Sequence, residues 1–472
     1  MSGIKKNLFY SILLILANYV FPFLTYPYVS RVLGVSNIGA CNFVDSVINY
    51  FILFSMLGLD SLGVREIAKH RGDRESLNRT FSNLLAVNML LTVLMLCLLA
   101  VLTFTVPQLA AHKDLMFFGA FKLLFNSLLV EWLYKGLEDF KLITLRSIIV
   151  KSLYVASVFI FVRKREDVWI YYMLSCMMVV VNALVNMALS RSRVSLTFKG
   201  LDLALTFKSM LSLGLYAILT SMYTTFNVTF LGFAAGETQV GFYGTATKLY
   251  GIIMALFTAF TSVMIPRMSN LVASGDMEKF RSYFSLAVEV LLGFSLPLIA
   301  WMMIMAPDIV LLISGPEFGG AVIPMTIIAP LLFVVGYEQI LVLQTLMPLG
   351  KDKILLRNSL IGAVTGVLLN LLVVPSLMAV GSAIVWIVSE LLILVLSQVA
   401  VSRSLSIEFP VKTTLMNIVG YLPLLALVFL CTKLGAGLVP RLLVSVCVVS
   451  VYVFLYQLLV RKRNLIEILL RR

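Results

Sequence analysis

The most regular feature of the chain is a succession of apolar stretches of about 20 residues, separated by short polar segments. A stretch of this length, folded as a helix, crosses the hydrocarbon core of a bilayer. Fourteen stretches predict helices over residues 8–30, 42–63, 82–106, 116–136, 142–162, 168–190, 210–233, 244–266, 285–306, 323–347, 354–375, 379–402, 414–434 and 439–460. The pattern therefore predicts an all-α polytopic membrane protein with about 14 transmembrane helices, and a count of 12 stays open.

Two polar segments between these stretches repeat one another about 203 residues apart. Residues 72–82, GDRESLNRTFS, match residues 275–285, GDMEKFRSYFS. A second pair of glycine-containing segments, 33–39 and 231–241, has nearly the same separation. Each copy lies between apolar runs, so the repeated unit is a bundle of membrane helices. Two bundles of matching topology are typical of secondary transporters.

The repeat predicts two lobes of six helices each. We expect an N-lobe over residues 1–190, a cytoplasmic linker over 191–208 and a C-lobe over 209–402. Residues 403–472 have no counterpart and are predicted to form two more helices and a basic C-terminal tail. Because each lobe has six helices, equivalent helices run in the same direction. The lobes are thus predicted to be a parallel repeat about an axis along the membrane normal.

The composition excludes an ordinary soluble domain. Of 472 residues, 60% are hydrophobic and 13% are charged, and the mean hydropathy is +1.01. Soluble domains carry about 25% charged residues.

The placement of the basic residues predicts which loops face the cytoplasm. Alternate loops, starting with the N-terminus, hold 27 of the 37 Lys and Arg residues, and the intervening loops hold 7. Because basic loops stay in the cytoplasm, both termini are predicted to be cytoplasmic. The net charge of +14 then reports topology and contact with anionic lipids, not nucleic-acid binding. Within this basic surface, residues 64–81 are expected to form a short amphipathic helix on the membrane.

Cysteine and histidine patterns give no sign of a cofactor. The five cysteines are scattered, there is no CxxC pair, and the chain has only two histidines. We therefore expect neither a metal site nor a disulfide framework.

Several motifs together carry a family resemblance over residues 8–402. Residues 131–141, EWLYKGLEDFK, continuing to TLRS at 144–147, closely resemble the hairpin between helices four and five of bacterial polysaccharide flippases. PYVSRVLG at 27–34, REIA at 65–68, GFY at 241–243 and PRMS at 266–269 are similar to other motifs of that family. These flippases export O-antigen and exopolysaccharide lipid carriers, and they belong to the multidrug/oligosaccharidyl-lipid/polysaccharide exporter superfamily. One departure is Asn227, where relatives often carry Asp.

The resemblance implies a substrate, a membrane and partners. The substrate would be an undecaprenyl-diphosphate-linked oligosaccharide, moved by alternating access from the cytoplasmic to the outer leaflet of the bacterial inner membrane. It also implies a polysaccharide polymerase and a chain-length regulator as protein partners. Because an unpaired charge is very costly in hydrocarbon, a cleft that moves a diphosphate must offer cations.

Four basic residues are the candidates for contact with the substrate. Intramembrane Lys and Arg cost about 2.5–3.5 kcal/mol on insertion scales, which points to function. Lys248 lies about one turn inside the eighth stretch, Lys122 and Lys151 lie inside the fourth and fifth, and Arg31 follows the first. The alternatives are structural pairing with a carboxylate for Lys122 and Lys151, snorkelling for Lys248 and interfacial anchoring for Arg31.

Three acidic residues are the candidates for ion coupling by H⁺ or Na⁺. Asp45 lies one turn inside the second stretch, where the repeat makes it equivalent to Lys248, so the two are expected to form a pair that lines the cleft. Glu338 and Glu390 lie deep in the tenth and twelfth stretches. They are expected either to carry protons or to pair with Lys151 or Lys122.

Other function classes fit the sequence less well. An enzyme acting on the same lipid-linked sugars would need catalytic groups on a large outer loop, and the outward loops are short. No glycine-rich nucleotide loop indicates direct use of ATP. The main alternative is a cation-coupled multidrug extruder of the same superfamily, which would favour an acidic, aromatic cleft.

Overall fold

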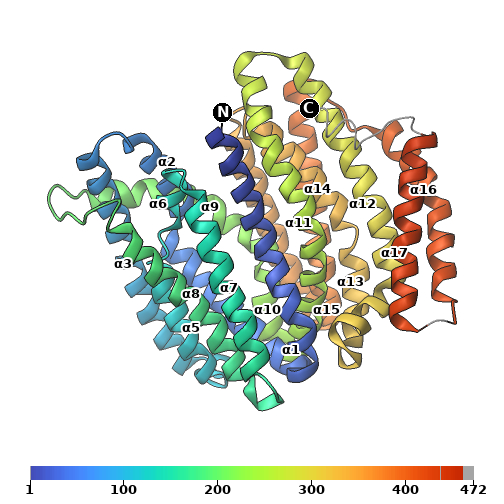
Figure 1. The fold of residues 1–472 in the computed structure, drawn as a ribbon, viewed down its shortest axis with the longest axis horizontal. Coiled ribbons are helices and arrows are strands. Elements are labelled where there is room, and N and C mark those ends of the chain that lie inside the picture. Colours follow the sequence, from blue (N-terminus) through green and yellow to red (C-terminus); the bar gives the residue numbers. More distant parts are fainter. Residues whose placement is uncertain (1, 436, 461–472) are drawn as a thin grey trace. The chain divides into compact units, whose positions relative to one another are not determined.

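The computed structural model describes residues 2–435 and 437–460, which are almost entirely helical and contain no strand. Figure 1 shows the helices in chain order. The helices of the first half are α1 (Ser2–Met56), α2 (Leu59–His70), α3 (Arg74–Thr105), α4 (Pro107–Ala110), α5 (Lys113–Asn126), α6 (Glu131–Gly136), α7 (Phe140–Phe161), η1 (Arg165–Asp167), α8 (Val168–Ser190), α9 (Leu203–Thr224) and α10 (Phe226–Ala235). Those of the second half are α11 (Glu237–Ser274), α12 (Met277–Ser314), η2 (Pro316–Ala321), α13 (Val322–Ile328), α14 (Leu331–Leu341), η3 (Val342–Leu346), α15 (Asp352–Leu405), α16 (Val411–Thr432), α17 (Leu438–Leu455) and η4 (Tyr456–Val460).

The predicted class, an all-α polytopic membrane protein, is confirmed. Within the described residues, 11 helices are long and apolar enough to cross a membrane, or 12 if the bent pair 316–328 and 331–346 is one span. A helix of 55 residues, the length of α1, would be about 80 Å long, far more than the roughly 30 Å hydrocarbon core. If the bent pair is one span and α1 and α15 are two spans each, the total is the predicted 14. This count stays a prediction.

Helix α1 changes direction at Gly34, whose backbone is not helical (φ 79°, ψ 171°). Glycine adopts such a conformation without the strain that a Cβ would add. Before this break, the carbonyl of Tyr10 accepts a hydrogen bond from Thr144 on α7 at 2.9 Å. After it, Asp45 contacts Lys122 on α5. The part of α1 before Gly34 thus contacts α7, and the part after it contacts α5.

Some predicted elements have different bounds in the structure. The stretch 116–136 is divided between α5 and α6, because Val130 takes a left-handed conformation (φ 39°) at the start of α6. The single amphipathic helix expected over 64–81 is wrong. Helix α2 ends at His70, and α3 begins at Arg74 after the Gly72–Asp73 turn.

The repeated GD segments have the same local structure. The Asp73 carboxylate caps α3 by accepting from the Glu75 N–H at 3.0 Å, and Asp276 caps α12 by accepting from the Lys279 N–H at 3.1 Å. An Asp at this position satisfies an N–H that has no partner within the helix. The sequence match thus reflects two equivalent helix starts, and the repeat of whole lobes stays a prediction.

The chain forms two compact units, residues 1–241 and 242–472. In the first unit, buried apolar side chains of α2, α3 and α6 form a core around Trp132, which is 1% exposed. A Cβ on Gly63 would lie 2.8 Å from the Trp132 ring, so only glycine leaves room for the indole. Helix α9 packs on α1, α2 and α3 in this unit. The division into two repeated lobes joined by a linker at 191–208 stays a prediction.

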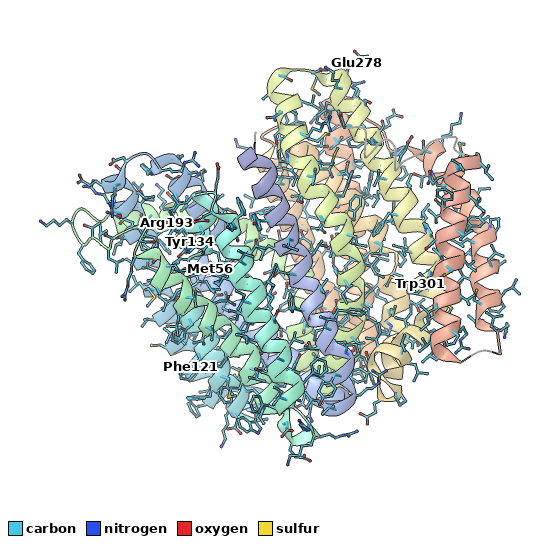
Figure 2. The ribbon with its side chains drawn as sticks, viewed as in Figure 1. Met56, Phe121, Tyr134, Arg193, Glu278 and Trp301 are labelled. Atoms are coloured by element: carbon cyan, nitrogen blue, oxygen red, sulfur yellow. The ribbon has the colours of Figure 1, made fainter. Side chains whose placement is uncertain are left out.

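In the second unit, α12 packs against α16 and α17. The indole N–H of Trp301 on α12 donates to the Ser445 hydroxyl on α17 at 2.8 Å (Figure 2). Asp308 on α12 and Arg441 on α17 form an ion pair at 2.9 Å, with 15% and 24% of their side chains exposed. The predicted basic tail, residues 461–472, lies outside the described residues.

Candidate functional site

Lys122 on α5 and Asp45 on α1 form an ion pair inside the first unit. The Lys122 Nζ lies 2.5 Å from Asp45 Oδ1 and 3.1 Å from Asn49 Oδ1. The Asn49 amide donates to the other Asp45 oxygen at 3.2 Å. Lys122 is thus neutralised by a carboxylate, the structural alternative for this residue, and its contact with substrate stays a prediction.

Lys151, in the middle of α7, is in a different environment. Its side chain is buried, with 8% of the residue exposed, and its ammonium group donates to the amide oxygen of Asn18 on α1. Among the described residues of the first unit, no carboxylate lies within 4 Å of the ammonium group. The predicted pairing of Lys151 with Glu338 or Glu390, which belong to the second unit, stays a prediction. Lys151 thus differs from Lys122, because the side-chain partner of this buried cation is a neutral amide and not a carboxylate.

A buried arginine network lies next to Lys151 and was not among the sequence candidates. Arg146 on α7 is 7% exposed, donates to Glu131 Oε1 at 3.0 Å and donates to the Asn186 side chain on α8. The Tyr134 hydroxyl donates to the Asn186 carbonyl at 2.6 Å. The sequence could have indicated Arg146 as a candidate, because it is an arginine five residues before Lys151 in the same apolar stretch.

In the second unit, Glu338 on α14 and Glu390 on α15 lie together. Their carboxyl groups are close enough to interact. The Trp386 indole N–H donates to Glu390 Oε1 at 3.0 Å. Two ionised carboxylates at close range repel each other, and a shared proton or a small cation would relieve this repulsion. No Lys or Arg of the described second unit lies within 4 Å of either group, which makes the pair able to hold a proton or a small cation.

The other two basic candidates, Arg31 and Lys248, lie on α1 and α11. Arg31 is exposed on α1 and donates to the Pro27 carbonyl at 2.9 Å. Lys248 is partly buried on α11 in the second unit. Its pairing with Asp45, and the substrate contacts of both basic residues, stay predictions. Asn227, the departure from the family pattern, is fully buried on α10.

Within residues 2–435 and 437–460, no group of three or more His, Cys, Asp or Glu side chains could hold a metal ion. All five cysteines are free thiols.

Comparisons of the sequence with known proteins point to polysaccharide export. Residues 4–272 match the family described as "Polysaccharide biosynthesis protein". The chain is 27% identical over 401 residues to the "Putative O-antigen transporter" of Escherichia coli (strain K12), covering 83% of this chain and 95% of that protein. The prediction of a carrier and not an enzyme is confirmed by relatives that are named as transporters.

Solved structures of two transporters have a fold similar to that of this chain. A structure of "Lipid II flippase MurJ, inward closed conformation" superposes with a TM-score of 0.75 at 13% identity, covering 95% of this chain and 98% of that one. An inward-facing "multidrug resistance MATE family transporter of the MOP superfamily" superposes with a TM-score of 0.61 at 14% identity, covering 82% and 94%. At these identities the similarity shows the fold, and it agrees with the predicted class of an all-α polytopic membrane protein.

Proposed function

The chain belongs to the family of polysaccharide biosynthesis proteins, and from this membership we propose that it is a lipid-linked oligosaccharide flippase. Its substrate is an undecaprenyl-diphosphate-linked repeat unit, which it moves from the cytoplasmic to the outer leaflet for cell-surface polysaccharide synthesis. The membrane helices and the transporter relatives support a carrier. The substrate and the direction of movement are the proposed part.

The observation that carries the proposal is the environment of Lys151. It is buried at the middle of a membrane helix, and its hydrogen-bond partner, Asn18, is neutral. An intramembrane lysine costs about 2.5–3.5 kcal/mol to insert, and no carboxylate of the described residues offsets this at close range. A diphosphate that reaches the ammonium group would supply the missing negative charge.

The neighbouring basic residues have different parts in this proposal. Arg146 is held by Glu131 and Asn186, so it keeps α6, α7 and α8 together beside Lys151. Lys122 is held by Asp45, which reduces the charge that it offers to an anion. Arg31 and Lys248 remain proposed substrate contacts. Lys151 is therefore the first residue to test.

Ion coupling is proposed at Glu338 and Glu390. The two carboxyl groups are in contact and have no basic partner within 4 Å in the described second unit. A site of this kind takes up H⁺ or Na⁺ and changes its charge when it does so. Asp45, already paired with Lys122, is a weaker candidate for coupling.

The proposed location is the bacterial inner membrane, with both termini in the cytoplasm and with membrane lipids, a polysaccharide polymerase and a chain-length regulator as partners. The charge distribution of the loops supports this orientation. Reporter fusions at Gly200 and at the C-terminus are both expected to be active in the cytoplasm. A C-terminal fusion active only outside would contradict the even number of spans.

The alternative is a cation-coupled multidrug extruder. One specific observation favours it: the buried acidic pair Glu338 and Glu390, beside the Trp386 indole, has the chemistry that binds an organic cation. A drug-sensitive strain that expresses the protein tests this alternative. Protection against cationic drugs, without any effect on glycan export, would favour the extruder.

The flippase activity is tested with purified protein in liposomes that contain a prenyl-diphosphate-linked glycan. We expect the glycan to change leaflet while its mass stays the same. A deletion strain should accumulate the lipid-linked oligosaccharide, and complementation should remove it. A lengthened glycan would mean a polymerase and would overturn the proposal.

A further inference from the structure

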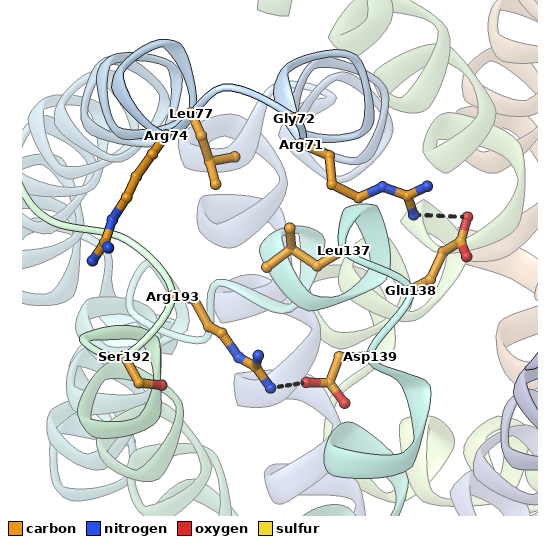
Figure 3. Close-up of a pocket in the computed structure, with 9 residues that line it drawn as sticks. All are labelled: Arg71, Gly72, Arg74, Leu77, Leu137, Glu138, Asp139, Ser192 and Arg193. Carbon is orange, nitrogen blue, oxygen red and sulfur yellow. Dashed lines mark hydrogen bonds and ion pairs between the residues drawn. The ribbon is translucent and has the colours of Figure 1, made fainter.

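A pocket with a volume of about 550 Å³ lies at one end of the first unit (Figure 3). It is formed by the α2–α3 turn, the start of α3, the α6–α7 turn and the segment after α8. In Figure 2, Arg193 marks this end of the unit, near Tyr134 and far from Phe121. The distribution of basic residues predicts that this end faces the cytoplasm.

Three arginines and two carboxylates line the pocket. Arg71 pairs with Glu138 at 3.2 Å, and Arg193 pairs with Asp139 at 2.8 Å. The side chains of Arg71 and Glu138 are 52% and 60% exposed. Exposed pairs of this kind contribute about 0–1 kcal/mol. Their guanidinium groups can therefore exchange a carboxylate for a stronger acceptor at low cost.

Arg74 gives the pocket its excess positive charge. Among the described residues, no carboxylate lies within 4 Å of its guanidinium group, and Figure 3 shows it without an ion pair. Arg74 is also the first residue of α3, which is 32 residues long. The N-terminus of α3 is already capped by the Asp73 carboxylate, so the guanidinium group of Arg74 is what this wall offers to an anion.

The backbone at Glu138 is strained. Its φ of 61° is in the left-handed region, which a residue with a Cβ adopts at a cost. This conformation lies between α6 and α7 and places Glu138 and Asp139 opposite different arginines (Figure 3). The same conformation ends α6, because the N–H groups of Glu138 and Asp139 donate to the carbonyls of Lys135 and Tyr134 in a Schellman-type cap.

The rest of the lining consists of Gly72, Leu77, Leu137 and Ser192, and its two leucines indicate what kind of anion fits. Leu77 and Leu137 lie between the charged groups. A wall that combines guanidinium groups with leucine side chains, at the surface of a membrane, suits the head of a lipid better than a small soluble ion.

We propose that this pocket binds the phosphate of a lipid headgroup from the adjacent leaflet, held by Arg71, Arg74 and Arg193. Arg71 and Arg193 release Glu138 and Asp139 when the phosphate enters, and Arg74 binds it directly. Two sources share this chemistry: an anionic phospholipid and the diphosphate of a prenyl carrier. Only the second source rests on the proposed function.

Native mass spectrometry of the purified full-length chain tests the proposal, with phosphatidylglycerol, farnesyl diphosphate and inorganic pyrophosphate as probes. Arg74→Gln combined with Arg193→Gln should weaken binding of one lipid probe about tenfold or more. Arg65→Gln is the matched control, because Arg65 is an exposed arginine of α2 outside the pocket. This control should stay within about twofold of the unmodified protein.

Removing the competing carboxylates gives an effect of opposite sign. Glu138→Gln with Asp139→Asn should strengthen lipid binding several-fold, and this variant keeps the proposal testable if the arginine variants fold poorly. Tighter binding of phosphatidylglycerol identifies a membrane phospholipid, and tighter binding of farnesyl diphosphate identifies the carrier. Equal binding by all pocket variants, or pyrophosphate bound as tightly as both lipids, would overturn the proposal whether or not the protein transports a glycan.

Discussion

Asp45 and Lys122, 77 positions apart in the sequence, form an ion pair at 2.5 Å between α1 and α5. The Asp45 side chain is 38% exposed and the Lys122 side chain is 16% exposed, so the ion pair is only partly buried. We expect Asp45→Asn or Lys122→Gln alone to destabilise the protein by about 1–3 kcal/mol, because each change strands one charge. The double variant should recover abundance in the membrane. Lower abundance for the double variant than for either single one would contradict a simple pair.

Lys151 is expected to respond differently. Lys151→Gln should reduce glycan export at least about tenfold while protein abundance stays nearly normal, because no carboxylate is stranded. Lys151→Arg should restore part of the export by keeping the charge. Export is measured as accumulation of lipid-linked oligosaccharide in a complemented deletion strain. Normal export by Lys151→Gln would remove this residue from the mechanism.

Arg146 should be needed for folding more than for transport. Arg146→Ala removes the partner of the Asn186 side chain and one of two basic partners of Glu131, which is 30% exposed and keeps its contact with Lys135. We therefore expect a cost below the roughly 3–5 kcal/mol for breaking a fully buried pair. We expect the variant to be scarce in membranes and to unfold early in a thermal assay in detergent. Normal abundance with lost export would instead make Arg146 a substrate contact.

The carboxyl pair should control how transport depends on pH. Glu338→Gln can still donate a hydrogen bond to Glu390, so the fold should be kept. Because it cannot gain or lose a proton, its transport in liposomes should no longer follow an imposed pH gradient, or a sodium gradient if Na⁺ is the ion. Asp352→Asn, at the exposed start of α15, is a suitable control. Unchanged gradient dependence in Glu338→Gln and Glu390→Gln would exclude coupling at this pair.

The two helix caps should make stability fall in acid. Hydrogen bonds from Ser76 and the Glu75 N–H lower the pKa of Asp73, and those from Lys279 lower the pKa of Asp276. A carboxyl group with a lowered pKa stabilises the fold above its unfolded value, about 3.9, and this contribution is lost as the pH falls through the folded value. Thermal unfolding at pH 7 and pH 3 should therefore differ more for the unmodified protein than for Asp73→Asn with Asp276→Asn. An equal difference would contradict the assignment.

The sequence predicted local features well where they depend on nearby residues. The matching GD segments form matching caps because an Asp before a helix acts on N–H groups two or three residues ahead. The prediction that the apolar stretches form helices likewise depends only on residues that are close in the sequence. Breaks such as Val130 in the stretch 116–136 were missed, because hydrophobicity is continuous across them.

Contacts between residues far apart in the chain could not be predicted from the sequence. Lys151 meets Asn18 across 133 positions, and nothing in either segment indicates the other. Arg146 was overlooked because it lies near the start of an apolar stretch, where a basic residue usually marks an interface. The pairing of Lys122 with a carboxylate was one of two stated alternatives, and only a structure could identify Asp45 as the partner.

The ion pair between Asp308 and Arg441 has a consequence for the order of synthesis. The two residues are 133 positions apart, so the ribosome adds Arg441 about 7–27 s after Asp308 at 5–20 residues per second. During that interval α12 has been synthesised, but the Asp308 carboxylate has no guanidinium partner. Packing of α17 is thus a late step in the folding of the second unit. A chain truncated before Arg441 would carry an unneutralised carboxylate in the membrane.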